Sequence, residues 1–440
     1  MDGIRCCFPL IISALLVLQT EAFIPRKCRM DIPRSCRCRF PDRPLVSCRG
    51  NYTQVPKFPK PGVLYWKRIH TLDLSHNKIV YIGSDVCKDC LGIKRLDLSN
   101  NRITKVNKYA FTRCRWRYDL EYLDLSFNDI HGATMTGLGN LKNLKTLKLD
   151  HNPIMMIQPG TLPWMEKLHM LTLNDNRLLT LKLTSVYPKV LHVSVTPLSA
   201  ITLPRFIEEL VITKSRGIFD HPVIVDSSTF KYVALESCGL NASAIVNSGF
   251  FEDTPHLKHL SLKLNRLSSA DPENFSRLMT KVKDVEHLDL SKNEITEVTA
   301  EMFQPLTKLT HLNVSDNKIA KIDWRFLESL PDLESLDLSN NNITSSVGMK
   351  DFILNLTSLK SFSIGDNPFN CSCEDLRDLY DLVKISLRPP HMIGYNQITQ
   401  SLKCASPEEN VSRNVLNYFD EKCLDLEDES VTVGSGDLQV

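Results

Sequence analysis

The chain has 440 residues, of which 42% are hydrophobic and 24% are charged, and its formal net charge is +2. This is the composition of an ordinary folded protein, and it excludes a largely disordered or collagen-like chain.

Residues 1–22 have the layout of a secretory signal peptide. Arg5 precedes an apolar run from Cys6 to Leu18, and Thr20 and Ala22 are small residues at a plausible cleavage point. No later stretch reaches the roughly 18 uninterrupted apolar residues that a membrane-spanning helix needs. We therefore expect a secreted, extracellular chain without a membrane span. A natural soluble form and a shortened receptor both fit this pattern.

Residues 23–68 form a basic, cysteine-rich segment that contains Cys28, Cys36, Cys38 and Cys48. Residues 23–120 hold 22 Lys or Arg and 7 Asp or Glu, a net charge of +15, whereas residues 121–440 hold 30 and 42, a net charge of −12. A field of one sign speeds encounters with an oppositely charged partner. We predict binding to anionic glycans or acidic proteins, and the alternative is a solvated surface that only keeps the chain soluble. The candidate anion-binding residues are Arg34, Arg37, Arg39, Arg113, Arg115 and Arg117.

Residues 69–369 repeat one template, L-x-x-L-x-L-x-x-N-x-L/I, at a period near 24 residues. Alternate leucines of a short strand point inwards, and the asparagine side chain can bond backbone groups that the following bend leaves unpaired. Stacked coils then pair their strands into one parallel sheet. Phenylalanines later in the repeats, at positions 111, 275, 303, 326 and 352, are expected to stack on the opposite side. The thirteen copies begin at residues 69, 93, 120, 144, 168, 188, 207, 230, 257, 285, 309, 333 and 359.

The middle repeats depart from the template. Thr196, Ser215 and Cys238 replace the asparagine, and two repeats shorten to 20 and 19 residues. Drift in tolerant interior coils is the simpler explanation, and a distortion around a ligand is the alternative; we expect Cys238 to be a buried thiol. Outward positions in this region are apolar, which is typical of a contact patch. The candidate ligand-binding residues are Met170, Val190, Val195, Val211, Tyr232 and Leu264.

Two further constellations invite chemical hypotheses. His259, His287 and His311 occupy the same strand position in successive repeats, about 4.8 Å apart, where they could sense pH or hold a metal. We prefer the simpler interpretation, an exposed polar position of a repeated consensus. Cys87 and Cys90 form a C-x-x-C pair without the strand-to-helix setting of a redox motif. We expect a structural bridge from Cys114 to one of them.

Residues 370–424 form a second cysteine-rich segment with Cys371, Cys373, Cys404 and Cys423, and an acidic, flexible tail is expected at 425–440. The two cysteine clusters and the repeats between them resemble the extracellular leucine-rich-repeat proteins with N- and C-terminal flanking modules. The chain is most similar to a short Toll-like receptor ectodomain, because repeat lengths vary from 19 to 28 and the second cluster has four cysteines.

This resemblance implies an α/β solenoid, a right-handed leucine-rich-repeat horseshoe with a concave parallel β-sheet and disulfide caps. It also implies that Cys371 pairs with Cys404 and Cys373 with Cys423, whereas the pairing among Cys28, Cys36, Cys38 and Cys48 stays open. Eight Asn-X-Ser/Thr sequons predict glycosylation. They begin at Asn51, Asn241, Asn274, Asn313, Asn342, Asn355, Asn370 and Asn410.

The sequence contains no hydrolase, metalloprotease or phosphate-loop motif, so we expect no enzymatic activity, no cofactor and no metal. Few aromatic residues interleave the basic segment, which argues against specific nucleic-acid recognition. The leading hypothesis is a secreted protein that binds a protein, lipid or glycan ligand in innate-immune recognition, or that modulates a membrane receptor. The alternative is a matrix or adhesion component that binds glycans, collagen or growth factors.

Overall fold

The structure is a computed structural model. It describes residues 36–39, 45–56, 69–86, 90–106, 108–131, 135–157, 162–221, 223–386, 402–406 and 414–423. The predicted signal peptide (1–22), the acidic tail (425–440), Cys28, Arg34, Cys87 and Asn410 lie outside the described residues. The chain divides into two compact units. The first is Met1–Asn152 with Thr161–Lys167, and the second is Pro153–Gly160 with Leu168–Val440.

The first unit is a stack of coils whose strands form a sheet. β1 (Cys36–Arg39) and β2 (Leu45–Cys48) make an antiparallel hairpin, and the strands that follow are parallel. Each repeat strand is three residues long, with its central leucine buried and its flanking residues facing outwards, as the template predicts. The other elements of this unit are β3 (Thr71–Asp73), β4 (Arg95–Asp97), η3 (Arg115–Tyr118), β5 (Tyr122–Asp124), η4 (Thr136–Asn140) and β6 (Thr146–Lys148).

The second unit continues the same construction with a parallel sheet. Residues of neighbouring repeats lie directly opposite one another without a slip, for example Leu260 opposite Leu288 and Leu288 opposite Leu312. The strands of this sheet are β8 (Met170–Thr172), β10 (Val190–Ser194), β12 (Glu209–Thr213), β13 (Tyr232–Glu236), β14 (His259–Ser261), β15 (His287–Asp289), β17 (His311–Asn313), β19 (Ser335–Asp337) and β20 (Ser361–Ser363).

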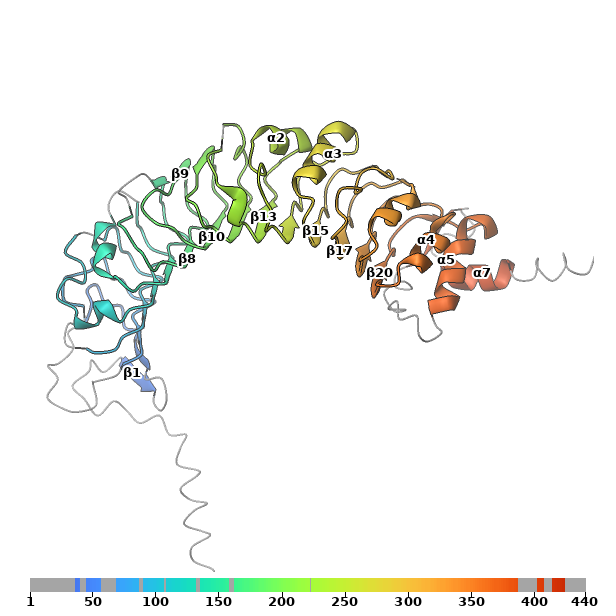
Figure 1. Cartoon of the computed structure of the whole chain (residues 1–440). Helices are drawn as coiled ribbons and strands as arrows, with labels where there is room; N and C mark the ends of the chain where they lie inside the picture. The colour runs from blue at the N-terminus through green and yellow to red at the C-terminus, as the bar shows by residue number, and fades with distance from the viewer. Residues whose placement is uncertain are drawn as a thin grey trace, which may run out of the picture. The chain divides into compact units, whose positions relative to one another are not determined.

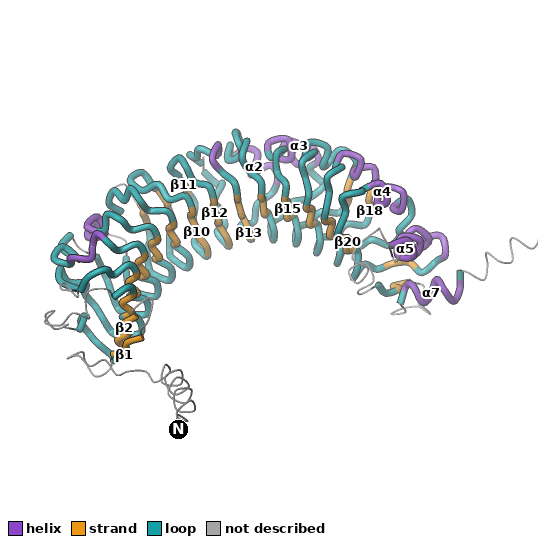
Figure 2. Tube along the Cα trace, turned by 60° about the horizontal axis from the view of Figure 1, so that its bottom comes forward, coloured by secondary structure: helices purple, strands orange, loops and turns teal. Residues whose placement is uncertain are grey.

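The opposite side of the second unit carries helices and minor strands (Figures 1 and 2). Strands β10 to β20 line the inner, concave side of this unit, and α2, α3 and α4 lie along its outer side. The outer elements are β7 (Met156–Ile157), β9 (Thr180–Lys182), β11 (Ala200–Thr202), η5 (Ser227–Thr229), α2 (Ala242–Asn247), α3 (Pro272–Lys281), β16 (Glu297–Val298), β18 (Lys321–Ile322), η6 (Trp324–Ser329) and α4 (Met349–Asn355). The parallel sheet on a concave side, predicted from the repeats, is therefore present in this unit.

Buried asparagines hold the turn after each regular strand. Asn293, for example, donates from Nδ2 to the carbonyl oxygens of Leu262, Leu290 and Ser291, and its Oδ1 accepts the backbone N–H of Leu267. These bonds satisfy backbone groups both within the asparagine's own turn and in the preceding coil. The asparagine therefore couples each coil to its neighbours.

The three middle repeats without the asparagine have longer strands. β10, β12 and β13 are five residues long, whereas the regular repeat strands are three, and their register runs unbroken from Ser194 through Thr213 to Glu236. In place of the asparagine bonds, the Cys238 thiol lies 3.5 Å from the carbonyl oxygen of Ile212, and the hydroxyls of Thr196 and Ser215 lie 3.3 Å apart. The extra backbone pairing replaces the missing side-chain bonds, so the departure from the template leaves the stack intact.

The aromatic core on the outer side agrees with the predicted column in part. Phe275, Phe303 and Phe326 are buried and in contact, with ring centroids 6.1 and 5.8 Å apart. Phe111 is buried in the first unit against Trp116, whereas Phe352 is only half-buried.

The C-terminal segment closes the end of the second unit. α5 (Cys373–Ser386) and α7 (Val415–Lys422) pack together, and β21 (Phe369–Asn370) pairs with β22 (Cys404–Ser406). Two disulfides join these elements, Cys371–Cys404 and Cys373–Cys423, the pairing that the resemblance implied. In the first unit a Cys36–Cys48 disulfide crosses the β1–β2 hairpin.

The expected bridge to Cys114 is wrong. Cys114 is a free, buried thiol that donates to the carbonyl oxygen of Val86 at 3.0 Å, although Cys90 is in a disulfide. Burial raises the pKa of the Cys114 thiol to about 12. Sequence spacing placed the three cysteines at equivalent points of adjacent repeats, but the Cys114 side chain turns into the core beside Trp116, where a hydrogen bond satisfies it. Cys238 is also free and buried, as expected.

Candidate functional site

Two rows of outward-facing side chains run across the sheet of the second unit. Each strand contributes its first residue to the first row and its third residue to the second row, since the residue between them is buried. The first row is Met170, Val190, Glu209, Tyr232, His259, His287, His311 and Ser335. The second row is Thr172, His192, Val211, Ala234, Ser261, Asp289, Asn313 and Asp337.

The structure does not bring the six candidate ligand-binding residues into one apolar patch. Met170 and Val190 are neighbours in the first row, but Glu209 separates Val190 from Tyr232. Glu209 Oε1 also lies 2.7 Å from His192 Nε2, so the position between Val190 and Tyr232 is polar. A column-by-column alignment of the repeats would have shown Glu209 in this row.

The other three candidates lie at separate places. Val211 stands in the second row between His192 and Ala234, and Ala234 is buried. Val195 and Leu264 lie at the turns beyond the strands, with φ angles of 54° and 59°, and they are 43% and 47% exposed. Apart from the neighbouring pair Met170 and Val190, the candidate residues therefore lie apart from one another and form no continuous apolar patch.

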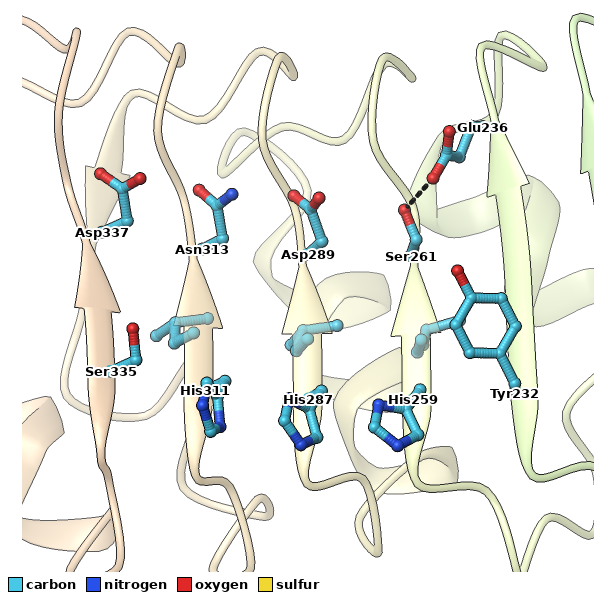
Figure 3. A pocket seen from close by; sticks show the side chains of 13 residues that line it. Tyr232, Glu236, His259, Ser261, His287, Asp289, His311, Asn313, Ser335 and Asp337 are labelled. Carbon is cyan, nitrogen blue, oxygen red and sulfur yellow. Dashed lines mark hydrogen bonds between the residues drawn. The ribbon is translucent and has the colours of Figure 1, made fainter. Parts of the chain in front are cut away.

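The first row contains a stack of three histidines, which Figure 3 shows beside Tyr232. The ring centroids of His259 and His287 are 4.2 Å apart, and those of His287 and His311 are 4.0 Å apart. Tyr232 lies at the end of the stack, 6.0 Å from His259, and is 38% exposed. Parallel strands in register force this stacking, because equal positions in adjacent repeats stand one strand spacing apart.

Opposite the histidines, the second row presents carboxylates and an amide. Asp289 and Asp337 flank Asn313 (Figure 3), and in each of the three residues Oδ1 accepts the backbone N–H of the serine two residues later, at 2.8 to 3.0 Å. The Asn313 side chain thus replaces an aspartate without changing the local bond. Glu236 completes this side by accepting a 2.6 Å hydrogen bond from the Ser261 hydroxyl.

Together these side chains line an open pocket of about 350 Å³, which we call the histidine pocket. Tyr232, the three histidines and Ser335 form one side, and Glu236, Ser261, Asp289, Asn313 and Asp337 form the other. The pocket begins at β13, the last strand of the coils that lack the asparagine, and extends over β14, β15, β17 and β19. The sequence pattern favoured an exposed polar position of the repeat for these histidines, and that interpretation does not predict a pocket.

Burial and charge act together on the titratable groups of the histidine pocket. The pKa of His287 is lowered first by burial and then by the neighbouring His311 and His259, whose charges would repel its own. The pKa of the Tyr232 hydroxyl is raised by burial and by the negative charges of Glu236, Glu209 and Asp289. Within the described residues, no group of three or more His, Cys, Asp or Glu side chains is arranged to hold a metal ion.

The candidate anion-binding residues lie in the first unit on separate elements. Arg37 and Arg39 are exposed on β1. Arg115 is the first residue of η3, Arg113 lies two residues before it, and both are exposed. Arg117 is bound within the chain, since it donates to the carbonyl oxygen of Thr112 and, at 2.7 Å, to the Tyr118 hydroxyl.

Seven of the eight sequon asparagines lie in described segments. Asn51, Asn241, Asn342 and Asn355 are exposed, whereas Asn274, Asn313 and Asn370 are half-buried. Asn241 caps α2 by accepting the N–H of Ala244 at 2.7 Å. Among the described segments, no helix combines the length and apolarity needed to cross a lipid bilayer.

Comparison with known proteins places this geometry in a family. The profile described as "Leucine rich repeat" matches residues 67–116, 118–178 and 279–319, and the one described as "Leucine Rich repeats (2 copies)" matches residues 307–349. The chain belongs to the leucine-rich-repeat proteins. The expected fold class, a leucine-rich-repeat solenoid with a long parallel sheet, is thereby confirmed.

Several leucine-rich-repeat relatives match parts of the chain. Podocan of Mus musculus is 28% identical over 231 residues, which cover 52% of this chain and 33% of podocan. Adenylate cyclase of Schizosaccharomyces pombe is 25% identical over 278 residues, which cover 62% of this chain and 13% of that protein. The chain thus spans a third or less of the length of these relatives.

A solved structure shares the leucine-rich-repeat fold. The crystal structure of the mouse RP105/MD-1 complex matches with a TM-score of 0.55 at 19% identity, over 80% of this chain and 54% of that chain. At this identity the match shows the fold alone.

Proposed function

We propose that this leucine-rich-repeat chain is a secreted, glycosylated binding protein without enzymatic activity, and that a partner contacts the sheet face of its second unit. The observation that carries the proposal is the histidine pocket, about 350 Å³ of open space lined by stacked histidines, a tyrosine and carboxylates whose second oxygens the turn bonds do not use. The buried leucines and asparagines build the coils, so the outward rows are free to be specialised for recognition.

Extracellular location is supported by the cysteine chemistry. Cys36–Cys48, Cys371–Cys404 and Cys373–Cys423 form disulfides, and such bonds persist in oxidising compartments. The sequons at exposed asparagines fit the same route through the secretory pathway. Within this proposal, capture of a microbial or host ligand, or modulation of a membrane receptor, is the leading role.

The test is affinity capture from serum and conditioned medium with the mature chain and two variants. Tyr232→Ala removes a 38% exposed ring of the histidine pocket, and Tyr187→Ala removes a 37% exposed ring from a turn outside the strands. We expect specific partners to be lost with Tyr232→Ala and retained with Tyr187→Ala. Capture of nothing, or equal capture by all three proteins, would contradict the proposal.

A second candidate function, retention in the matrix through anionic glycans, is favoured by the charge of the first unit. Arg113 and Arg115 are exposed, and the chain between residues 23 and 120 has a net charge of +15. If this function holds, a heparin column retains the chain in a salt-dependent manner. Arg113→Gln with Arg115→Gln should then elute at lower salt than the matched pair Lys318→Gln with Lys321→Gln in the acidic part, and equal elution would exclude these arginines.

A further inference from the structure

The acidic side chains of the histidine pocket lack basic partners, unlike those at the start of the same strands. Glu286 pairs with Lys258 at 2.6 Å, and Glu334 pairs with Lys360 at 2.7 Å. No ion pair within the described residues involves Glu236, Asp289 or Asp337. These three carboxylates therefore carry their charge into the pocket without neutralisation.

Each of these carboxylates keeps an oxygen for a ligand. Asp289 and Asp337 use Oδ1 to bind the turn that follows, and Glu236 uses Oε1 to accept from Ser261. Among the described residues, the second oxygen of each group has no partner. Unprotonated ring nitrogens of the facing histidines are acceptors as well. At neutral pH the pocket is thus rich in acceptors and net negative, which complements an ammonium or guanidinium group.

The histidine stack makes this charge dependent on pH. Rings 4.0 to 4.2 Å apart repel one another when protonated, and burial disfavours the charged form of His287 as well. The lowered pKa of His287 keeps its ring neutral at pH 7, and protonation comes only below the ordinary histidine value of about 6.5. Acidification then places positive charges directly opposite the carboxylates.

Other charged groups near the stack do not reverse the direction in which the charge of the pocket changes with pH. Glu286 and Glu334 lie beside the rings at the strand entries and favour protonation, but each is already paired with a lysine. Asp289 lies on the same strand as His287. Tyr232 at the end of the stack is neutral at these pH values, since the ordinary tyrosine pKa is about 10 and its pKa is raised further. Lys263 on the turn beyond β14 makes no ion pair among the described residues.

Resting on the proposed binding function, we propose that the histidine pocket binds a lysine- or arginine-bearing segment of a protein partner at neutral pH and releases it on acidification, when the stacked histidines become charged. The carboxylates attract the basic segment, and protonation of the imidazoles opposes that attraction. The occupant is thereby defined by its chemistry, an exposed basic peptide segment rather than an acidic or apolar one.

The experiment measures binding of a fluorescent lysine-rich peptide by anisotropy, at about pH 7.4 and about pH 5.5. A glutamate-rich peptide of equal length is the control probe. Because Asn313 begins a sequon within the pocket, every protein carries Ser315→Ala, which prevents glycosylation there. This change removes the hydroxyl bond to Asn313 Oδ1 but keeps the backbone N–H bond to the same atom. One variant adds His259→Gln, His287→Gln and His311→Gln, and another adds Asp289→Asn and Asp337→Asn. Asn313 already shows that an asparagine makes the same turn bond at this position.

We expect the lysine-rich peptide to bind at the higher pH and to weaken about tenfold or more at the lower pH, whereas the glutamate-rich peptide does not bind. The histidine variant should bind at both pH values with less than about a threefold difference, and the aspartate variant should bind weakly at both. Melting temperatures at both pH values verify that the variants are folded.

Two outcomes overturn the inference. One is equal binding of the two peptides, or no binding of the lysine-rich peptide. The other is an unchanged pH dependence in the folded histidine variant. If the lysine-rich peptide does not bind but Tyr232→Ala still abolishes capture of natural partners, the binding function stands and the proposed occupant is wrong. If the peptide does not bind and Tyr232→Ala does not change capture, the pocket is not a binding site.

Discussion

At the scale of single residues, the same side chain has the same structural role in each coil of the repeat. Asn101, Asn128 and Asn293 each place Nδ2 against three carbonyl oxygens and accept a backbone N–H on Oδ1. Where the chain uses Cys238 instead, the thiol replaces only part of this set. An asparagine that satisfies four buried backbone groups contributes far more to the free energy of unfolding than the burial of its own side chain does.

Replacing Asn293 with alanine should lower the free energy of unfolding by at least about 2 kcal/mol, because one backbone N–H and three carbonyl groups lose a buried partner. Asn247→Ala, at an exposed position in α2, is the control and should change it by less than about 0.5 kcal/mol. Urea denaturation measures both. Equal effects of the two substitutions would show that the asparagine bonds do not stabilise the turn.

Asp97 illustrates the cost of a column of like charges in the first unit. It stands between Asp73 and Asp124 on adjacent strands, and its pKa is raised by burial and further by those two carboxylates. A raised pKa in the folded state stabilises the fold only at low pH, below the unfolded value of about 3.9, and this contribution is lost as the pH rises through the folded value.

Asp97→Asn should therefore stabilise the chain at neutral pH by roughly 0.2–1 kcal/mol, because like charges directly opposite one another on a sheet are unfavourable. The asparagine oxygen can still accept from Ser99, as that of Asn313 accepts from Ser315. Thermal denaturation at about pH 7 and about pH 3 should show the advantage disappear at the lower value. Exposed Asp119→Asn serves as the control, and a gain of the same size at both pH values would contradict the argument.

At the scale of elements, the coils are joined by aromatic packing on the outer side as well as by the sheet. Phe303 touches both Phe275 and Phe326, so one ring links three successive repeats. A second cluster, in which Phe250 contacts Phe219, Phe230 and Phe251, fills the outer side near α2. The sequence indicated only the first cluster, because its members share a repeat position and those of the second do not.

Phe303→Ala should destabilise the second unit by about 3–5 kcal/mol, since the ring is completely buried and neighbouring coils cannot close the cavity. Phe206→Ala, where the ring is 58% exposed, should have little effect. Denaturant titration compares the two variants. A small loss for Phe303→Ala would mean that the outer column does not hold the repeats together.

At the scale of the whole molecule, repeats interact with their neighbours, so stability is distributed along the chain and depends on protected ends. The C-terminal segment protects the last strand of the second unit, and Cys373–Cys423 closes a loop of 50 residues within it. Loss of this disulfide should therefore act locally first, on the coils next to it.

The variant Cys373→Ser with Cys423→Ser should lose about 2–5 kcal/mol of stability in the C-terminal segment. Hydrogen exchange is the measurement, and protection should fall first in α5 and β20, while β13 and β14 stay protected. Uniform loss of protection across the second unit would show that it unfolds as one cooperative block.

The sequence by itself determined the repeating parts of this protein. The spacing of leucines and asparagines predicted the strands, the parallel sheet and the turn bonds, because each depends on residues only a few positions apart and recurs in coil after coil. Resemblance to the flanking modules supplied the pairing of Cys371 with Cys404 and Cys373 with Cys423.

Only the tertiary structure decided which side chains share a surface and which are neutralised there. Glu209 interrupts the expected apolar patch, Cys114 turns into the core, and the histidines face carboxylates that form no ion pair within the described part of the chain. Neighbouring members of one row are separated by about one repeat in sequence yet lie one strand apart in space. Their chemistry depends on register, ring orientation and competing ion pairs, which arise only when the coils stack.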